Sequence, residues 1–188
     1  MEGMDAQQAL EWMRQFGFEL GGMNMRVMGI DELVQELREQ ARALQEQWDL
    51  SSAMDEMRQR LEDILDREQR AVHSAHGHES ARMNDFMGRR HAEGGGVADA
   101  VERFADYGFE DEEAGEDFRE LLEELERMRA LEEFMRQRGA RFRGPQQADY
   151  ETAQSIREQI EALEQMAQDL ADGNFEPISP EQLREMLG

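Results

Sequence analysis

Hydrophobic positions recur every three or four residues through most of this chain, as they do in helices that have one apolar face. The clearest stripe runs from Ile30 to Trp48, with Asp31 as its predicted N-cap. After a restart at Ser51 or Ser52, a second stripe runs from Met54 to Val72 and its helix ends near His76. Because only a short loop joins these two helices, the pattern predicts an antiparallel helical hairpin over residues 30–76.

Further helical patterns fill the rest of the chain. Residues 80–92 predict a short helix, and the acidic run from Asp111 to Asp117 predicts the start of a long one, over about 112–137. A last long helix is expected over 149–172, with a short heptad seam from Ala153 to Leu170. Asp5 is a candidate cap of a first short helix, and Ser179, Pro180 and Gln182 have the spacing of a capped final turn.

Glycine interrupts this pattern at two places. Residues 17–29 are apolar but rich in Gly, which predicts a packed loop with tight turns and at most one short strand. Residues 93–96, Glu93 followed by three Gly, are the best candidate for a hinge. We therefore expect an all-α fold, a multi-helix bundle of antiparallel helices, divided into an N-terminal region (residues 1–92) and a C-terminal region (residues 97–188).

Composition qualifies this picture without reversing it. The chain has 188 residues, of which 39% are hydrophobic, and a net charge of −23, which approaches the composition of disordered proteins. However, the apolar residues are periodic, 14 Met supplement them, and only 3 Pro occur. We therefore expect a folded chain, with the Met residues filling the core.

Charge and cysteine content limit the partners. A net charge of −23 repels phosphate backbones and anionic lipids, so neither nucleic acid nor a membrane is an expected partner. The sequence has neither an apolar run long enough for a membrane span nor a signal-peptide pattern at its start. With no Cys, it has no thiolate ligand or nucleophile, and the expected location is the cytoplasm.

Histidine supplies the only candidates for a metal site. His73, His76 and His78 lie close together, and His73 and His76 have the three-residue spacing that places ligands on one helix face. Gly77 breaks that helix, however, so a polar junction that happens to contain His is the favoured interpretation. These three residues remain weak candidates, and no cofactor is expected.

The sequence contains no motif for calcium binding or for a known type of catalytic site. The acidic run after Asp106 lacks the spacing of a calcium loop, and no phosphate loop, nucleophile elbow or zinc-protease helix occurs. Paired carboxylates carry no information in a chain with 44 acidic residues. The sequence therefore predicts a protein that is not an enzyme.

Several segments together resemble a known family region. They are Trp12–Gly22 with Arg26–Leu33, Leu61–Glu68, Tyr107–Phe109 with Ala114–Leu122, Asp149–Ala153, and Ile178–Leu183 with Leu187–Gly188. In this combination they resemble the helical region that precedes the von Willebrand factor type A (VWA) domain in a group of bacterial proteins. The VWA domain itself and its metal-ion adhesion motif are not in this sequence, so the resemblance carries over no metal ligand.

The resemblance implies an accessory role. Related proteins accompany MoxR-type AAA+ ATPases, so it implies a protein-interaction or adaptor module whose partner is a VWA domain or such an ATPase. It also implies that the chain either is a piece of a longer protein or is encoded as the helical region alone. Two alternatives stay open: a self-associating, homo-oligomeric structural protein paired through the seam from Ala153 to Leu170, and a helical metal-binding protein.

Overall fold

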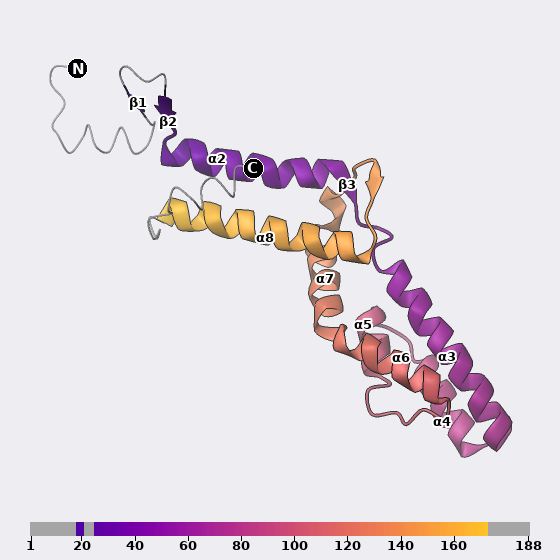
Figure 1. The fold of residues 1–188 in the computed structure, drawn as a ribbon. Coiled ribbons are helices and arrows are strands. Elements are labelled where there is room, and N and C mark those ends of the chain that lie inside the picture. The colour runs from indigo at the N-terminus through magenta and orange to yellow at the C-terminus, as the bar shows by residue number, and fades with distance from the viewer. Residues whose placement is uncertain (1–17, 21–24, 173–188) are drawn as a thin grey trace. The chain divides into compact units, whose positions relative to one another are not determined.

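The computed structural model describes residues 18–20 and 25–172, and in this range the chain is mostly helical (Figure 1). Its α-helices are α2 (Ile30–Gln47), α3 (Asp55–His76), α4 (Ala81–Arg90), α5 (Val97–Glu102), α6 (Glu112–Glu123), α7 (Leu125–Arg138) and α8 (Tyr150–Asp172). The prediction of an all-α, multi-helix fold is confirmed. The predicted first helix from Asp5 and the final turn from Ser179 lie outside the described residues.

The chain divides into two compact units. Of the described residues, the first unit contains those up to Leu44 and those from Glu158 onward, and the second unit is Gln45–Arg157. This division differs from the predicted one at residues 93–96, because the Gly run lies inside the second unit. A contiguous split was the simplest expectation from the sequence, whereas the first unit joins two segments that are far apart along the chain.

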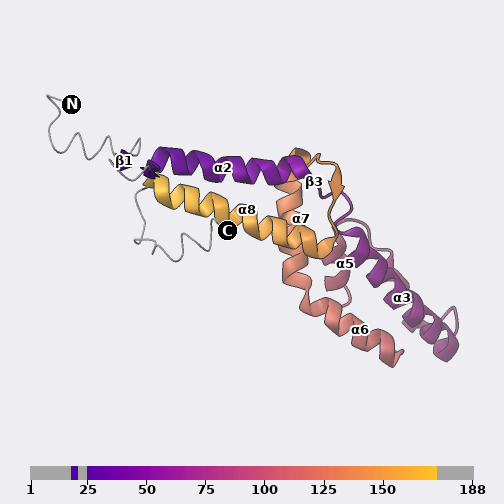
Figure 2. The same ribbon diagram turned by 45° about the horizontal axis from the view of Figure 1, so that its top comes forward.

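Helices α2 and α8 share the core of the first unit. Val34 and Leu37 of α2 form a buried cluster with Ala167 and Leu170 of α8. Figures 1 and 2 show the two helices side by side, the yellow end of α8 next to the start of α2. The sequence instead predicted that α2 pairs with α3, the next helix along the chain. That prediction used only proximity in the sequence.

The Gly-rich segment near the N-terminus contains a short antiparallel ladder. Strand β1 (Phe18–Leu20) pairs with β2 (Met25–Val27), so that Phe18 faces Val27 across the ladder. A loop with at most one strand was expected here, and the structure instead has two. The residues between these strands lie outside the described range of the chain.

Aromatic side chains form the centre of the second unit. Phe104 and Tyr107 contact each other edge to face, with ring centroids 5.5 Å apart. Phe86 of α4 contacts both rings, and Phe118 of α6 packs against Phe104. Such offset and edge-to-face pairs add to the stability gained by burying the rings. The cluster joins α4 and α6 through the segment after α5.

The predicted long helix over 112–137 is in fact two helices. Asp111 caps α6 as expected, since its carboxylate accepts a hydrogen bond of 2.8 Å from the Ala114 amide. The chain then bends at Glu124, which separates α6 from α7. Neither Gly nor Pro marks this bend, and the apolar periodicity continues through it. The periodicity of the apolar residues therefore could not predict this break.

The Gly run before α5 is held in place by α7. Gly94 and Gly95 adopt positive φ angles of 89° and 83°, which Gly tolerates best. The Glu132 carboxylate on α7 accepts a hydrogen bond of 2.6 Å from the Val97 amide at the start of α5. A Cβ atom at Gly96 would collide with that carboxylate. These contacts anchor the segment that was expected to be a hinge.

A short parallel pairing joins the two ends of the second unit. Strand β3 (Trp48–Asp49) pairs with β4 (Gln146–Gln147), which follows a 3₁₀ turn, η1, at Gly139–Arg141. Between η1 and β4, the Gly144 amide donates to the Trp48 carbonyl at 3.0 Å. A Cβ atom at Gly144 would collide with the backbone of Gln47, so the close approach of the two segments requires Gly there.

Candidate functional site

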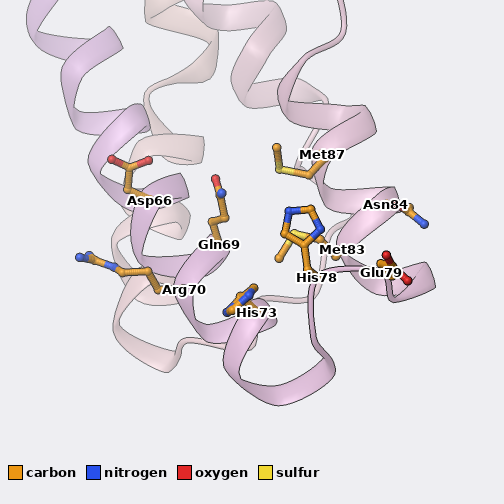
Figure 3. Close-up of a pocket in the computed structure, with 9 residues that line it drawn as sticks. All are labelled: Asp66, Gln69, Arg70, His73, His78, Glu79, Met83, Asn84 and Met87. Carbon is orange, nitrogen blue, oxygen red and sulfur yellow. The ribbon is translucent and has the colours of Figure 1, made fainter.

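The pocket that contains most of the predicted site residues lies in the second unit, between the last turns of α3 and helix α4 (Figure 3). It is open to solvent and has a volume of about 700 Å³. Acidic, basic, imidazole and thioether groups all contribute to its walls. The lining residues are Asp66, Gln69, Arg70, His73, His78, Glu79, Met83, Asn84 and Met87.

A tight turn between α3 and α4 sets the geometry of this pocket. Helix α3 ends at His76, and Gly77 follows as its C-cap with φ 81° while its amide donates to the His73 carbonyl. The Ser80 hydroxyl donates to the Gly77 carbonyl at 3.0 Å and accepts from the Met83 amide at 3.1 Å, which caps α4. The turn is therefore fixed at both ends by hydrogen bonds.

Two of the three candidate histidines meet in the pocket. The rings of His73 and His78 contact each other edge to face, with centroids 6.1 Å apart and an angle of 82° between the planes. Both side chains are exposed. The predicted break of the helix at Gly77 is confirmed, and it is this break that returns His78 toward His73.

The third candidate, His76, has a different partner. Its Nε2 lies 3.0 Å from an oxygen of Glu110, in the segment before α6. The structure thus does not bring His76 to the other two rings. Among the residues that the structure describes, no group of three or more His, Cys, Asp or Glu side chains is arranged to hold a metal ion.

An arginine fixes one wall of the pocket. Arg90 of α4 donates to Gln69 at 2.8 Å and pairs with Asp66 at 2.7 Å and Glu62 at 2.6 Å, all three on α3. Burial lowers the pKa of Arg90, but the hydrogen bonds to Asp66 and Glu62 outweigh it and raise that pKa overall. The guanidinium therefore stays charged and clamps α4 to α3.

Two methionines that were not expected to belong to a site form the opposite wall. Met83 and Met87 are one helical turn apart on α4, so their side chains share a face. Met83 is buried at 4% exposure, and Met87 is half-buried. The Met residues were expected to fill the core. One signal could have placed these two at the site: they are four residues apart and follow closely after His78.

A second polar site on α3 is closed to solvent. Glu68 has 0% exposure, and its carboxylate accepts hydrogen bonds from the Tyr107 hydroxyl at 3.0 Å, the Glu110 amide at 2.9 Å and the Asp111 amide at 3.0 Å. Burial, followed by the neighbouring Glu68, raises the pKa of Tyr107, so the phenol remains a hydrogen-bond donor. Glu68 thereby anchors the segment that leads into α6.

An arginine covers the aromatic side of this closed site. The guanidinium of Arg82 lies 4.2 Å from the centre of the Tyr107 ring, within range of a cation–π interaction. Arg82 also donates to the Gly108 carbonyl and lies 3.6 Å from Glu110. These contacts tie the segment to α4, as Glu68 ties it to α3.

Comparisons with known proteins identify neither a family nor a similar protein. No protein-family model matches the chain, and neither a curated protein nor a solved structure matches it. Among the described helices, none combines the length and the hydrophobicity that crossing a membrane requires.

Proposed function

We propose that the chain is a non-enzymatic protein-interaction module that acts in the cytoplasm as an adaptor in a VWA-domain system, together with a MoxR-type AAA+ ATPase. The identity of the partners rests on the resemblance of the sequence to the helical region that precedes VWA domains. The surface of the first unit supports an interaction role independently of that resemblance.

The observation that carries the proposal is the pairing of charge and apolar surface on the first unit. From residue 158 to its end, α8 contains five acidic residues and no basic one. Next to it, four hydrophobic side chains of α2 and α8 are only partly buried against the core cluster of this unit: Ile30, Leu33, Leu163 and Met166.

This combination favours a partner with a basic surface. Complementary charge speeds association and selects among partners, while burial of apolar area supplies much of the affinity. An acidic helix with a partly exposed apolar border fits a protein surface that presents Arg or Lys around an apolar strip. Nucleic acid is repelled by the same carboxylates.

Co-purification tests the assignment of the partners. The full chain, tagged and expressed in the host that encodes it, is expected to recover a VWA-domain protein or an AAA+ ATPase. Recovery of neither would contradict the proposal.

Matched charge variants test the surface. A triple variant of α8 removes three carboxylates: Glu158→Gln, Glu161→Gln and Asp172→Asn. It is expected to bind the purified partner about tenfold more weakly at low salt. A triple variant of α6 with the same change in charge is the control: Glu112→Gln, Glu116→Gln and Glu123→Gln. It is expected to bind as tightly as the wild type. Equal loss in both variants would show that only net charge matters.

Self-association through the α8 seam receives less support. The seam residues Ala153, Ile156 and Ile160 are at most 3% exposed within the single chain. Ala167 and Leu170 pack against α2 in the first unit. Because the seam is already buried, a second copy of the chain would have to displace intramolecular contacts to use it.

A further inference from the structure

We propose that the pocket between α3 and α4 binds a copper(I) ion, held by the imidazoles of His73 and His78 and by the thioether sulfurs of Met83 and Met87. All four residues line the same hollow in the second unit, two from the end of α3 and the following turn and two from α4 (Figure 3). This site is separate from the acidic surface of the first unit.

The two rings meet edge to face in the structure, and they are close enough for both to bind one ion once a nitrogen of each exposed ring turns toward it. A metal bound about 2.0 Å from a ring nitrogen lies roughly 3.2 Å from that ring's centroid, so two rings on one ion are at most about 6.4 Å apart. The observed separation of 6.1 Å is just inside that limit. Binding both rings at a tetrahedral angle, as in a four-coordinate ion, would bring the centroids to about 5.2 Å, so the two exposed rings would approach each other by roughly 1 Å on binding.

The types of ligand point to the same ion. Copper(I) has a closed d shell, accepts two, three or four ligands, and is selected by soft thioether donors. Zinc would need further nitrogen, thiolate or carboxylate ligands, and the described residues contain no group of three His, Cys, Asp or Glu arranged for one ion. Two imidazoles and two thioethers form a donor set that favours copper(I).

The turn holds these ligands near one another before any ion binds. The Gly77 amide donates to the carbonyl of His73, and Ser80 caps α4 through the amide of Met83 itself. Both hydrogen bonds therefore involve ligand residues directly. Because the backbone that carries the ligands is already fixed, less conformational entropy is lost on binding, which favours affinity.

A chelator competition on the full chain tests the site. The protein is titrated anaerobically with copper(I) in the presence of a chromophoric copper(I) chelator, and one ion per chain is expected to leave the chelator for the protein. Replacing Met83 and Met87 with Leu is expected to lower the affinity at least about tenfold, since the ligand set loses both thioethers. Replacing His73 and His78 with Ala is expected to abolish competition.

Matched controls separate the site from general effects. Met57→Leu with Met128→Leu removes two buried methionines outside the pocket, and His76→Ala with His91→Ala removes the other two histidines. Both control variants are expected to retain the wild-type affinity. Zinc, tested in parallel, is expected to bind more weakly and to be indifferent to the Met83 and Met87 substitutions.

Two results would overturn the proposal. One is a wild-type chain that removes no copper(I) from the chelator, and the other is a Met83/Met87 double variant with unchanged affinity. If burial of Met83 makes that variant unstable by circular dichroism, the half-buried Met87→Leu alone decides, with at least about a threefold loss of affinity expected.

Discussion

Helix α3 carries two polar sites within six residues, and they differ in almost every physical respect. Glu68 is fully buried, and three donors from the Tyr107–Asp111 segment satisfy its carboxylate. His73 is exposed, lines an open pocket, and contacts another imidazole, that of His78. One helix thus presents a closed site on one side and an open one on another.

The difference separates structural from functional polarity. A buried charge is retained only where its hydrogen bonds are satisfied, and removing one partner leaves other buried groups unpaired. The closed site therefore contributes to stability and has no capacity left for a ligand. The open site has donor atoms that the fold does not use, so a ligand can bind there at little cost to folding.

Removing the charge of the closed site tests this contrast with the largest expected effect. In Glu68→Gln, an NH2 group replaces one carboxylate oxygen and must face either the backbone N–H groups of Glu110 and Asp111 or the hydroxyl of Tyr107, so a buried donor loses its acceptor in both orientations. We expect the free energy of unfolding to fall by about 3 kcal/mol, measured by urea unfolding followed by circular dichroism. Asp63→Asn, on an exposed position of the same helix, is the control, with a change within about 0.5 kcal/mol. Equal midpoints for the two variants would show that Glu68 is not an anchor.

A matched pair of glycines tests how the turn supports the open site. Gly77 has φ 81° and ψ 170°, a conformation almost confined to Gly, whereas Gly88 lies within α4. A Cβ atom at either position meets nothing within 4 Å, so only the backbone distinguishes them. Gly77→Ala is expected to cost about 2 kcal/mol, and Gly88→Ala to stabilise by about 0.5–1 kcal/mol.

The same pair connects the turn to the pocket. Gly77→Ala is also expected to weaken copper(I) binding, because the turn returns His78 toward His73. Gly88→Ala is expected to leave the affinity unchanged. A Gly77→Ala chain with both normal stability and normal affinity would mean that the turn does not position these rings.

Tyr107→Phe probes a single hydrogen bond of the closed site. Losing the phenol leaves Glu68 with its two backbone donors, so a loss of about 1 kcal/mol is expected at pH 7. The pH dependence gives a second readout, since burial raises the pKa of Tyr107 above its ordinary value near 10. The folded chain keeps this proton where the unfolded chain loses it, so the stabilisation is full below pH 10 and declines as the pH rises above it.

For Tyr107, whose pKa is raised strongly, the expected slope above pH 10 is about 1.4 kcal/mol per pH unit. Burial raises the pKa of Tyr150 in the same direction, so the wild type has two contributions and Tyr107→Phe retains one. Urea unfolding at pH 9 and pH 11 measures the difference. An unchanged slope in Tyr107→Phe would show that its phenol ionises equally in both states.

The sequence predicted the helices of this molecule better than their partners. The apolar stripes of α3 and α8 and the acidic cap of α6 were readable because each depends on local spacing. The pairing of α2 with α8 was not readable, since no local signal specifies which of several similar stripes meets another. The bend at Glu124 was missed because no breaker residue marks it.

The candidate site was only partly predictable, for a similar reason. The sequence placed His73 and His78 near each other, and the structure brings their rings together. It also included His76, which instead contacts Glu110 from a distant segment. In the sequence, nothing distinguishes Glu68 from the other acidic residues, of which there are 44 in all. What distinguishes it is a tertiary contact, the hydrogen bond from Tyr107 of a distant segment.

The smallest expected effect on stability belongs to the open site, and it is the most discriminating. Replacing His73 and His78 together with Ala removes two exposed rings, so the free energy of unfolding is expected to change by less than about 0.5 kcal/mol in urea unfolding. His76→Ala, which removes an exposed contact with Glu110, is the control and is expected to behave alike. A loss above about 1 kcal/mol in the double variant would place the two rings in the folding core, and the contrast with Glu68 would fail. With stability preserved, loss of copper(I) binding in that same variant would report on the ligands alone, because the fold that holds Met83 and Met87 would still be intact.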